Sequence, residues 1–212
     1  MQRFMELYFT HNSGNSSRCI FALFESGIAW KQHPLDPHSG ETRSPEYLTI
    51  NPMGKVPALA HQGFLLWESN AINGYIAQKI PQARLLPASI EAQAAVQRWL
   101  FFQVSHVSPA CMSIFRVTSP RMQAFWKIKG DPQAAEQGRK EMARYLPVLE
   151  SALANRDWLE GEFSLADIAY APHVWLIDEG GFDFSAYPAV RAWLDRLFAR
   201  DAWKKTMELV FK

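Results

Sequence analysis

The feature that most restricts how this chain can fold is a proline at the head of an apolar strand. The segment Val56-Pro57-Ala58-Leu59 follows Asn51-Pro52-Met53-Gly54-Lys55 and predicts a strand from Val56 to His61. Proline cannot donate a hydrogen bond to a strand ladder, and a cis peptide bond is one good reason to keep it there. A cis Val56–Pro57 bond would expose the backbone N–H and C=O of Val56. Such an exposed pair can bind an extended peptide in the way that a neighbouring strand would.

A second feature follows shortly downstream, where Glu68-Ser69 leads into an apolar-periodic helix from Asn70 to Lys79. A hydroxyl and free backbone N–H groups then lie at a helix N-terminus, which attracts a carboxylate. Together the two features predict a receptor for a small peptide with a carboxylate at one end. Taken singly, each is also explained by a structural proline in a turn or by an ordinary capped helix, so it is their combination that favours a binding site.

The start of the chain supplies a hydroxyl-rich loop. Residues 5–9 alternate and predict a first strand, and residues 10–17 are turn and cap residues. A helix is expected from Arg18 to Glu25, with its N-cap at Asn15 or Ser16 and a stop at Gly27. Ser13 therefore lies just before a helix N-terminus.

Such a loop suits thiol chemistry. A free thiol has a pKa of about 8.5 and is mostly protonated at neutral pH. A hydroxyl that donates a hydrogen bond to the sulfur near a positive helix end favours the thiolate, which is the nucleophile. Ser13 is the candidate for this role, and Ser16 is more simply a helix cap.

The element order predicts two domains. Residues 1–80 read as strand-helix-strand-helix-strand-strand-helix, a thioredoxin-like α/β unit (βαβαββα) with a mixed four-stranded sheet. Prolines break the pattern in a linker, residues 81–89, and from residue 90 to 212 the period is helical throughout, which predicts an all-α bundle. Within it, we expect one long helix from Ile90 to about Ser108, a poorly periodic connection over 118–130, and a capping box at Ser164 and Asp167.

The segment Ser13-Gly14-Asn15-Ser16-Ser17-Arg18-Cys19-Ile20 resembles the serine-type members (theta, zeta and phi classes) of the cytosolic glutathione S-transferase family, and the resemblance extends over the whole chain. It implies that Ser13 is catalytic. Tyr8 is the alternative, because the tyrosine-type classes keep a tyrosine near the end of the first strand, and Ser16 is a further one. The resemblance places Val56 and Pro57 in the glutathione-binding site, with the backbone of Val56 at the cysteinyl part, and it assigns Glu68 and Ser69 to the γ-glutamyl part.

The family resemblance leaves two parts of the site open. The glycyl carboxylate of glutathione has four candidate partners: Thr42 and Arg43, which stand where the phi class has a His-Lys pair, and His38 and Lys55. The apolar co-substrate has a candidate pocket on the helices, which is equally well explained as core or dimer surface. Its expected residues are His11, Phe102, His106, Met112, Phe115 and Arg116.

Composition excludes several other functions. The chain has 212 residues, a formal net charge of +1 and no basic run, so we expect no nucleic-acid partner. Neither a signal peptide nor an apolar run of about 20 residues is present, so we expect a cytoplasmic location and no membrane partner. Cys19 and Cys111 have no metal-ligand spacing, so we expect no metal and glutathione as the only cofactor-like molecule, used as co-substrate.

The expected function is therefore transfer of glutathione to a small, apolar electrophile by an enzyme that the resemblance implies is a homodimer. One alternative is an isomerase similar to maleylacetoacetate isomerase, whose signature continues Ser-Ser-Cys where this chain has Ser13-Gly14-Asn15. Another is a non-enzymatic protein-binding module with the same fold. A thiol-disulfide reductase would need a cysteine in the Ser13 loop, and the loop has none.

Overall fold

The computed structural model describes residues 4–211, which divide into two compact units. Within the described range, the first unit comprises residues 4–86 together with 201–211, and the second comprises residues 87–200. The chain therefore divides differently at its C-terminal end from the sequence-based domains, which assign all of 90–212 to the helical domain. The last helix, α10 (Asp201–Val210), packs in the first unit against α1 (Gly14–Ser26) because it buries Trp203, Thr206 and Val210 there.

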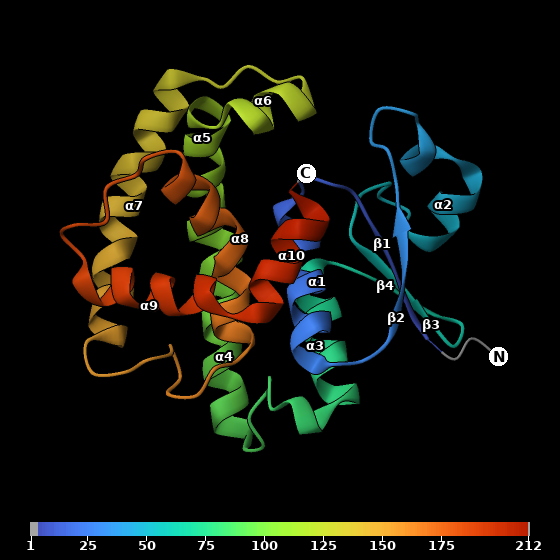
Figure 1. Ribbon diagram of the computed structural model, residues 1–212, viewed down its shortest axis with the longest axis horizontal. Coiled ribbons are helices and arrows are strands. Elements are labelled where there is room, and N and C mark those ends of the chain that lie inside the picture. The colour runs from blue at the N-terminus through green and yellow to red at the C-terminus, as the bar shows by residue number, and fades with distance from the viewer. Residues whose placement is uncertain (1–3, 212) are drawn as a thin grey trace. The chain divides into compact units, whose positions relative to one another are not determined.

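The first unit is built on a four-stranded mixed sheet (Figure 1). Its strands are β1 (Met5–Phe9), β2 (Trp30–Pro34), β3 (Ala58–His61) and β4 (Phe64–Trp67), in the order β2-β1-β3-β4. The pair β1–β2 is parallel, whereas β1–β3 and β3–β4 are antiparallel. The alternation of β1 explains its place at the centre of the sheet, since Met5, Leu7 and Phe9 are buried on one face. The predicted thioredoxin-like order is confirmed.

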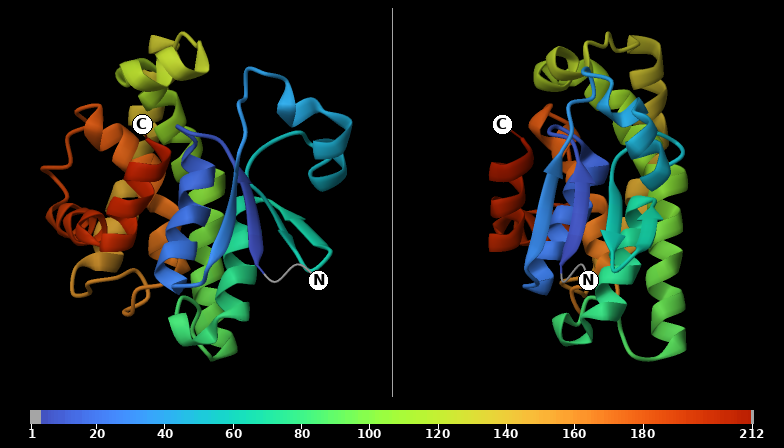
Figure 2. Two further views of the ribbon diagram at one scale, coloured as in Figure 1. Left: turned by 45° about the vertical axis from the view of Figure 1, so that its right-hand side comes forward. Right: turned by 90° about the vertical axis from the view of Figure 1, so that its right-hand side faces the viewer.

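Helices cover both faces of this sheet. α1 and α3 (Ser69–Lys79) lie on one face and the short α2 (Pro45–Ile50) on the other, as Figure 1 and the rotated views of Figure 2 show. The sequence explains where these helices begin and end. Ser44 caps α2 by accepting from the N–H of Tyr47, and α1 stops at Gly27, whose positive φ of 67° suits glycine.

The second unit is a helical bundle, which confirms the predicted fold class. α8 lies at its core and is buried along most of its length, which explains why its sequence is apolar on all sides. Within residues 4–211, no helix is long and apolar enough to cross a bilayer. The helices of this unit are α4 (Ile90–Phe102), α5 (Ser108–Thr118), α6 (Pro120–Trp126), α7 (Pro132–Leu153), α8 (Leu165–Glu179) and α9 (Pro188–Ala199).

Two expectations for this bundle are wrong. The single helix expected from Ile90 to about Ser108 is regular only to Phe102 and then continues into α5 through a π-helical turn, Gln103–Val107, in which the N–H of Ser108 donates to the carbonyl of Gln103. Proline cannot donate to the preceding turn, and one wider turn accommodates the change of hydrogen-bond register. The connection over 118–130 contains a helix, α6, which Ser119 caps by accepting from the N–H of Met122 and which has Pro120 in its first turn.

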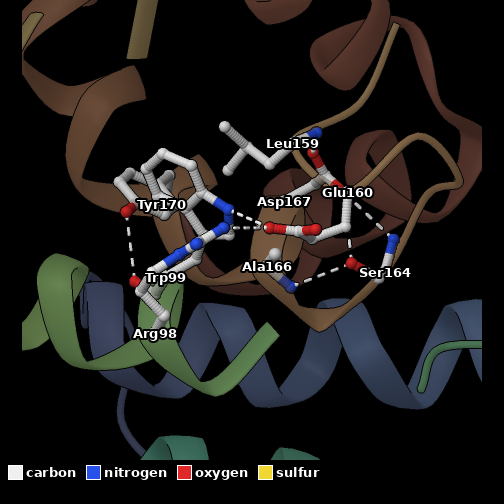
Figure 3. A network of polar contacts seen from close by, with 8 residues as sticks. All are labelled: Arg98, Trp99, Leu159, Glu160, Ser164, Ala166, Asp167 and Tyr170. Carbon is white, nitrogen blue, oxygen red and sulfur yellow. Dashed lines mark hydrogen bonds and ion pairs between the residues drawn. The ribbon is translucent and has the colours of Figure 1, made fainter. Parts of the chain in front are cut away.

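A buried carboxylate organises the second unit (Figure 3). Asp167 accepts hydrogen bonds from the backbone N–H groups of Leu159 and Ser164, both at 3.0 Å. It also accepts one from Nε1 of Trp193, which the figure does not draw, at 3.0 Å. Ser164 in turn accepts from the N–H of Ala166, so the predicted capping box is present. Burial raises the pKa of Asp167 to about 6, although these hydrogen bonds oppose the rise.

Candidate functional site

Ser13 is the N-cap of α1, which corrects the prediction of a cap at Asn15 or Ser16. Its Oγ accepts from the N–H of Ser16 at 3.2 Å, and its carbonyl accepts from the N–H and hydroxyl of Ser17 at 2.9 and 2.7 Å. The cap uses a lone pair of Oγ, so the hydroxyl hydrogen of Ser13 can donate to a ligand. Ser13 is 8% exposed, whereas Ser16 is fully buried. Ser13 therefore combines a helix N-terminus with a hydroxyl donor in one residue.

A cavity of about 150 Å³ lies in the first unit, beside the N-terminal turn of α1. Five of the predicted glutathione-binding residues line this cavity: Lys55, Val56, Pro57, Glu68 and Ser69. The Val56–Pro57 peptide bond is cis, as the sequence predicts. Asn15 also lines the cavity, two residues after Ser13, so the helix end that Ser13 caps adjoins the predicted peptide site.

The loop that precedes Val56 is held by Asn51 and Tyr47. Asn51 donates from Nδ2 to the carbonyl of Lys55 at 2.6 Å and accepts on Oδ1 from the N–H of Met53 at 3.0 Å. The hydroxyl of Tyr47 donates to the same Lys55 carbonyl at 2.6 Å. Gly54 has a φ of +59°, and a Cβ there would lie 2.7 Å from the carbonyl oxygen of Thr42. The hydrogen bonds of Asn51 and Tyr47 and the close approach at Gly54 therefore fix the backbone conformation of this loop.

The other candidates for the glycyl carboxylate do not line the cavity. Arg43 donates from Nη1 to the carbonyl of Met53 at 3.1 Å, which gives it a supporting role in the loop. Thr42 presents its carbonyl to Gly54, and the N–H of His38 donates to Asp36 within a surface turn. Of the four residues, the geometry therefore favours Lys55.

Tyr8 lies on the face of the sheet that α2 covers. Its ring stacks on His33 with centroids 4.5 Å apart and also contacts Tyr47. Burial and the nearby Glu6 carboxylate raise the pKa of Tyr8, so its phenol is less acidic than usual. Neither Tyr8 nor Ser13 lines the cavity itself, but Ser13 caps the helix whose residue Asn15 does, and this favours Ser13 over Tyr8.

The co-substrate candidates fall into separate groups. In the second unit, the rings of Phe102 and His106 lie 5.4 Å apart and both contact Tyr145. Phe115 is only 5% exposed and stacks on His173, Met112 is half-buried, and Arg116 is exposed. His11 belongs to the first unit, where its Nδ1 bonds the carbonyl of Leu209 at 3.0 Å.

Several residues with a place in the site are not predicted from the sequence. Arg18 is 1% exposed and donates from Nη1 to Oδ1 of Asn70 at 3.4 Å, which places a buried cation between α1 and the first turn of α3. An Asn before Pro-x-Gly is a turn signal that points to Asn51. The unpredicted residues that line the cavity are Asn15, Asn51, Met53 and Trp67.

The fold defines a protein with a thioredoxin-like unit, which contains the cavity, and a helical unit. The profile described as "Glutathione S-transferase, N-terminal domain" matches residues 5–78, and "Glutathione S-transferase, C-terminal domain" matches residues 111–201. The chain therefore belongs to the glutathione S-transferase family.

Individual relatives agree with this assignment. A probable glutathione S-transferase, GSTF2, from rice (Oryza sativa subsp. japonica) is 31% identical, and the alignment covers 97% of each chain. The solved structure of glutathione S-transferase I bound with lactoylglutathione has a TM-score of 0.88 at 29% identity and covers 97% of this chain and 99% of that one. The glutathione transferase URE2P6 from Phanerochaete chrysosporium, in complex with oxidised glutathione, has a TM-score of 0.81 at 31% identity. The match covers 96% of this chain and 94% of that one.

Proposed function

We propose that this chain is a glutathione S-transferase of the serine type, which activates the thiol of glutathione for attack on a small electrophile. One observation carries the proposal. Ser13 caps α1 with its hydroxyl hydrogen available, and the helix end that it caps adjoins a cavity lined by Val56, Pro57, Glu68 and Ser69. The bound lactoylglutathione and oxidised glutathione of two structural relatives support glutathione as the ligand.

The cavity offers a separate partner for each part of glutathione. The backbone of Val56 pairs with the cysteinyl residue as a neighbouring strand would. Ser69 and the N-terminus of α3 receive the γ-glutamyl carboxylate, because a helix N-terminus carries partial positive charge and free N–H donors. Glu68 faces the same cavity and suits the γ-glutamyl ammonium, and Lys55 suits the glycyl carboxylate. No metal is required for this binding mode.

Ser13 then acts on the sulfur. The thiol releases its proton to solvent, and the hydroxyl of Ser13 donates a hydrogen bond to the thiolate that remains. The N-terminus of α1 adds partial positive charge at the same place. The thiolate lone pair forms a new carbon–sulfur bond with the electrophile, whose leaving group departs with the electron pair of the bond that breaks. Ser13 changes no covalent bond of its own, so it needs no histidine or acid partner.

We also propose a two-fold homodimer in the cytoplasm, as in the family. The apolar side chains on the edge strand β4 support a dimer, because Phe64 is 48% and Leu65 is 42% exposed. Exposed apolar groups gathered at one edge are typical of an interface. Analytical ultracentrifugation tests this proposal, and a monomer at all concentrations would contradict it.

The function is tested directly by measuring binding of glutathione to the purified chain and its conjugation to a chlorinated nitroaromatic. We expect both binding and conjugation. If the chain binds glutathione but does not conjugate this probe, a panel of electrophiles from other chemical classes is tested in the same assay. A chain that binds glutathione but reacts with none is not a transferase, and a chain that does not bind glutathione has neither the ligand nor the function proposed here.

Replacing Asn51 with alanine is expected to weaken glutathione binding about tenfold, because the change removes both side-chain hydrogen bonds that fix the loop before Val56 and each contributes about 0.5–1.5 kcal/mol. Asn51→Asp keeps the acceptor for Met53 and removes only the donor to Lys55, so a smaller loss is expected. Asn155→Ala, an exposed asparagine in the second unit, is the matched control. Isothermal titration with glutathione gives the dissociation constants, and equal values for Asn51→Ala and wild type would contradict the role given to this loop.

A further inference from the structure

The loop that presents Ser13 has an unusual backbone. Asn12 precedes Ser13 directly and has a φ of +53°, a left-handed conformation that few non-glycine residues adopt and that asparagine tolerates better than most. Thr10, Asn12 and Ser13 are all buried. A conformation of this kind persists where surrounding contacts hold it in place, so the contacts of the loop are informative.

Two of those contacts reach the far end of the chain. The backbone N–H of Asn12 donates to the carbonyl of Val210 at 2.9 Å, and Nδ1 of His11 bonds the carbonyl of Leu209 at 3.0 Å. Both carbonyls belong to the last turn of α10, where a helix has no N–H of its own to offer them. A carbonyl oxygen only accepts, so Nδ1 of His11 carries the hydrogen of this bond.

α10 is itself fixed to the helix that Ser13 caps. Trp203 is 2% exposed, and its ring lies 5.4 Å from that of Phe21 on α1. Thr206 and Val210 are fully buried on the same helix. The last turn of α10 is therefore held relative to α1, and through His11 and Asn12 it holds the residues just before Ser13.

We propose that the C-terminal turn of α10 positions Ser13, with His11 and Asn12 as positioning residues. Ser13 is then fixed from both sides, because Ser17 binds its carbonyl and α10 binds the residues before it. This inference rests on the proposed function, in which Ser13 donates to the glutathione sulfur. Small displacements of a donor weaken a hydrogen bond steeply, so release of this loop lowers the stabilisation of the thiolate. It gives His11 a role different from the co-substrate contact that the sequence suggests.

The inference separates thiolate stabilisation from binding. The cavity residues Val56, Glu68 and Ser69 come from the 51–57 loop and from the start of α3. Within residues 4–211, neither segment is hydrogen-bonded to Leu209 or Val210. Loosening the His11–Leu209 bond is therefore expected to change the pKa of the bound thiol and to leave glutathione affinity nearly unchanged. A residue with a purely structural role would not show this pattern.

The test compares His11→Phe with His11→Asn. Phenylalanine keeps a ring against Phe9 and removes the donor, whereas the amide nitrogen of asparagine stands close to the position of Nδ1 and restores it. The pKa of the bound thiol is measured from the ultraviolet absorbance of the thiolate as a function of pH, with the dissociation constant of glutathione measured on the same samples. For His11→Phe we expect a thiol pKa higher than wild type, a kcat about fivefold lower at neutral pH and an unchanged dissociation constant, since one neutral hydrogen bond is lost. His11→Asn is expected to recover most of the loss.

A wild-type thiol pKa in His11→Phe overturns the inference, even where the melting temperature falls. If His11→Phe does not fold, Asn12→Ala provides the same test. Alanine tolerates the left-handed φ poorly, so this variant shifts the loop while the sequence of α10 stays unchanged. Ser13→Ala is measured in parallel. If Ser13→Ala leaves the thiol pKa unchanged, the proposed function fails; if it raises the pKa and the loop variants do not, only the positioning role of α10 fails.

Discussion

Replacing Ser13 with alanine is expected to raise the pKa of glutathione's thiol in the complex by about 1–2 units and to lower the conjugation rate at neutral pH about 10- to 100-fold. The hydroxyl of Ser13 lies at the N-terminus of α1, and a hydrogen bond to a charged group contributes about 1.5–3 kcal/mol. One pKa unit corresponds to about 1.4 kcal/mol, so the two expected effects have one cause. Binding of glutathione is expected to change little, because the cavity residues are intact.

The measurement is the pH dependence of kcat/KM together with the thiolate absorbance of the bound form. Ser16→Ala and Tyr8→Phe are the matched controls, since Ser16 is fully buried and the ring of Tyr8 stacks on His33. Both controls are expected to keep the wild-type thiol pKa. A normal rate in Ser13→Ala with a large loss in Tyr8→Phe would transfer the role to the phenol and make the enzyme tyrosine-type.

The site illustrates what local sequence chemistry can and cannot predict. The cis bond before Pro57 could be predicted because only proline commonly accepts a cis peptide bond. The helix expected from Asn70 begins one residue earlier, at Ser69, after Glu68, an N-cap residue that makes no side-chain cap hydrogen bond. The cap of α1 could not be predicted, because Ser13, Asn15 and Ser16 can all cap a helix and the choice depends on the whole fold. The proposal of Lys55 rather than Arg43 for the glycyl carboxylate also depends on the structure, since Arg43 donates to the carbonyl of Met53.

The helical part shows a different limit. Periodicity indicates which residues of α10 are buried but not which unit covers them. The packing of Trp203 and Val210 beside α1 therefore could not be predicted from the sequence pattern. The sequence pattern also does not predict the π-helical turn before Pro109, because this turn changes the hydrogen-bond register without changing the apolar pattern. In contrast, α6 has an N-cap at Ser119 and Pro120 in its first turn, and greater weight on these two residues would have predicted it.

Replacing Asp167 with alanine is expected to reduce the free energy of unfolding by about 3–5 kcal/mol, the largest stability effect that the structure suggests. The change leaves the N–H groups of Leu159 and Ser164 and Nε1 of Trp193 without their acceptor in a buried environment. Urea unfolding followed by tryptophan fluorescence measures the loss. Glu162→Ala removes an exposed carboxylate from the same loop and is expected to leave the midpoint unchanged. Similar midpoints for the two variants would show that the Asp167 network contributes little.

The pH dependence of the same measurement tests the electrostatics of this site. Because burial raises the pKa of Asp167 to about 6, above the usual 3.9, the native state binds a proton at this carboxyl more tightly than the unfolded chain does. Its contribution to stability is then complete below about pH 4 and is lost as the pH rises through about 6, a change of roughly 3 kcal/mol. Asp167→Asn cannot titrate, so the stability of wild type relative to this variant is expected to fall between pH 4 and pH 7. A rise over this range would mean that the three hydrogen bonds outweigh burial and keep the carboxylate ionised.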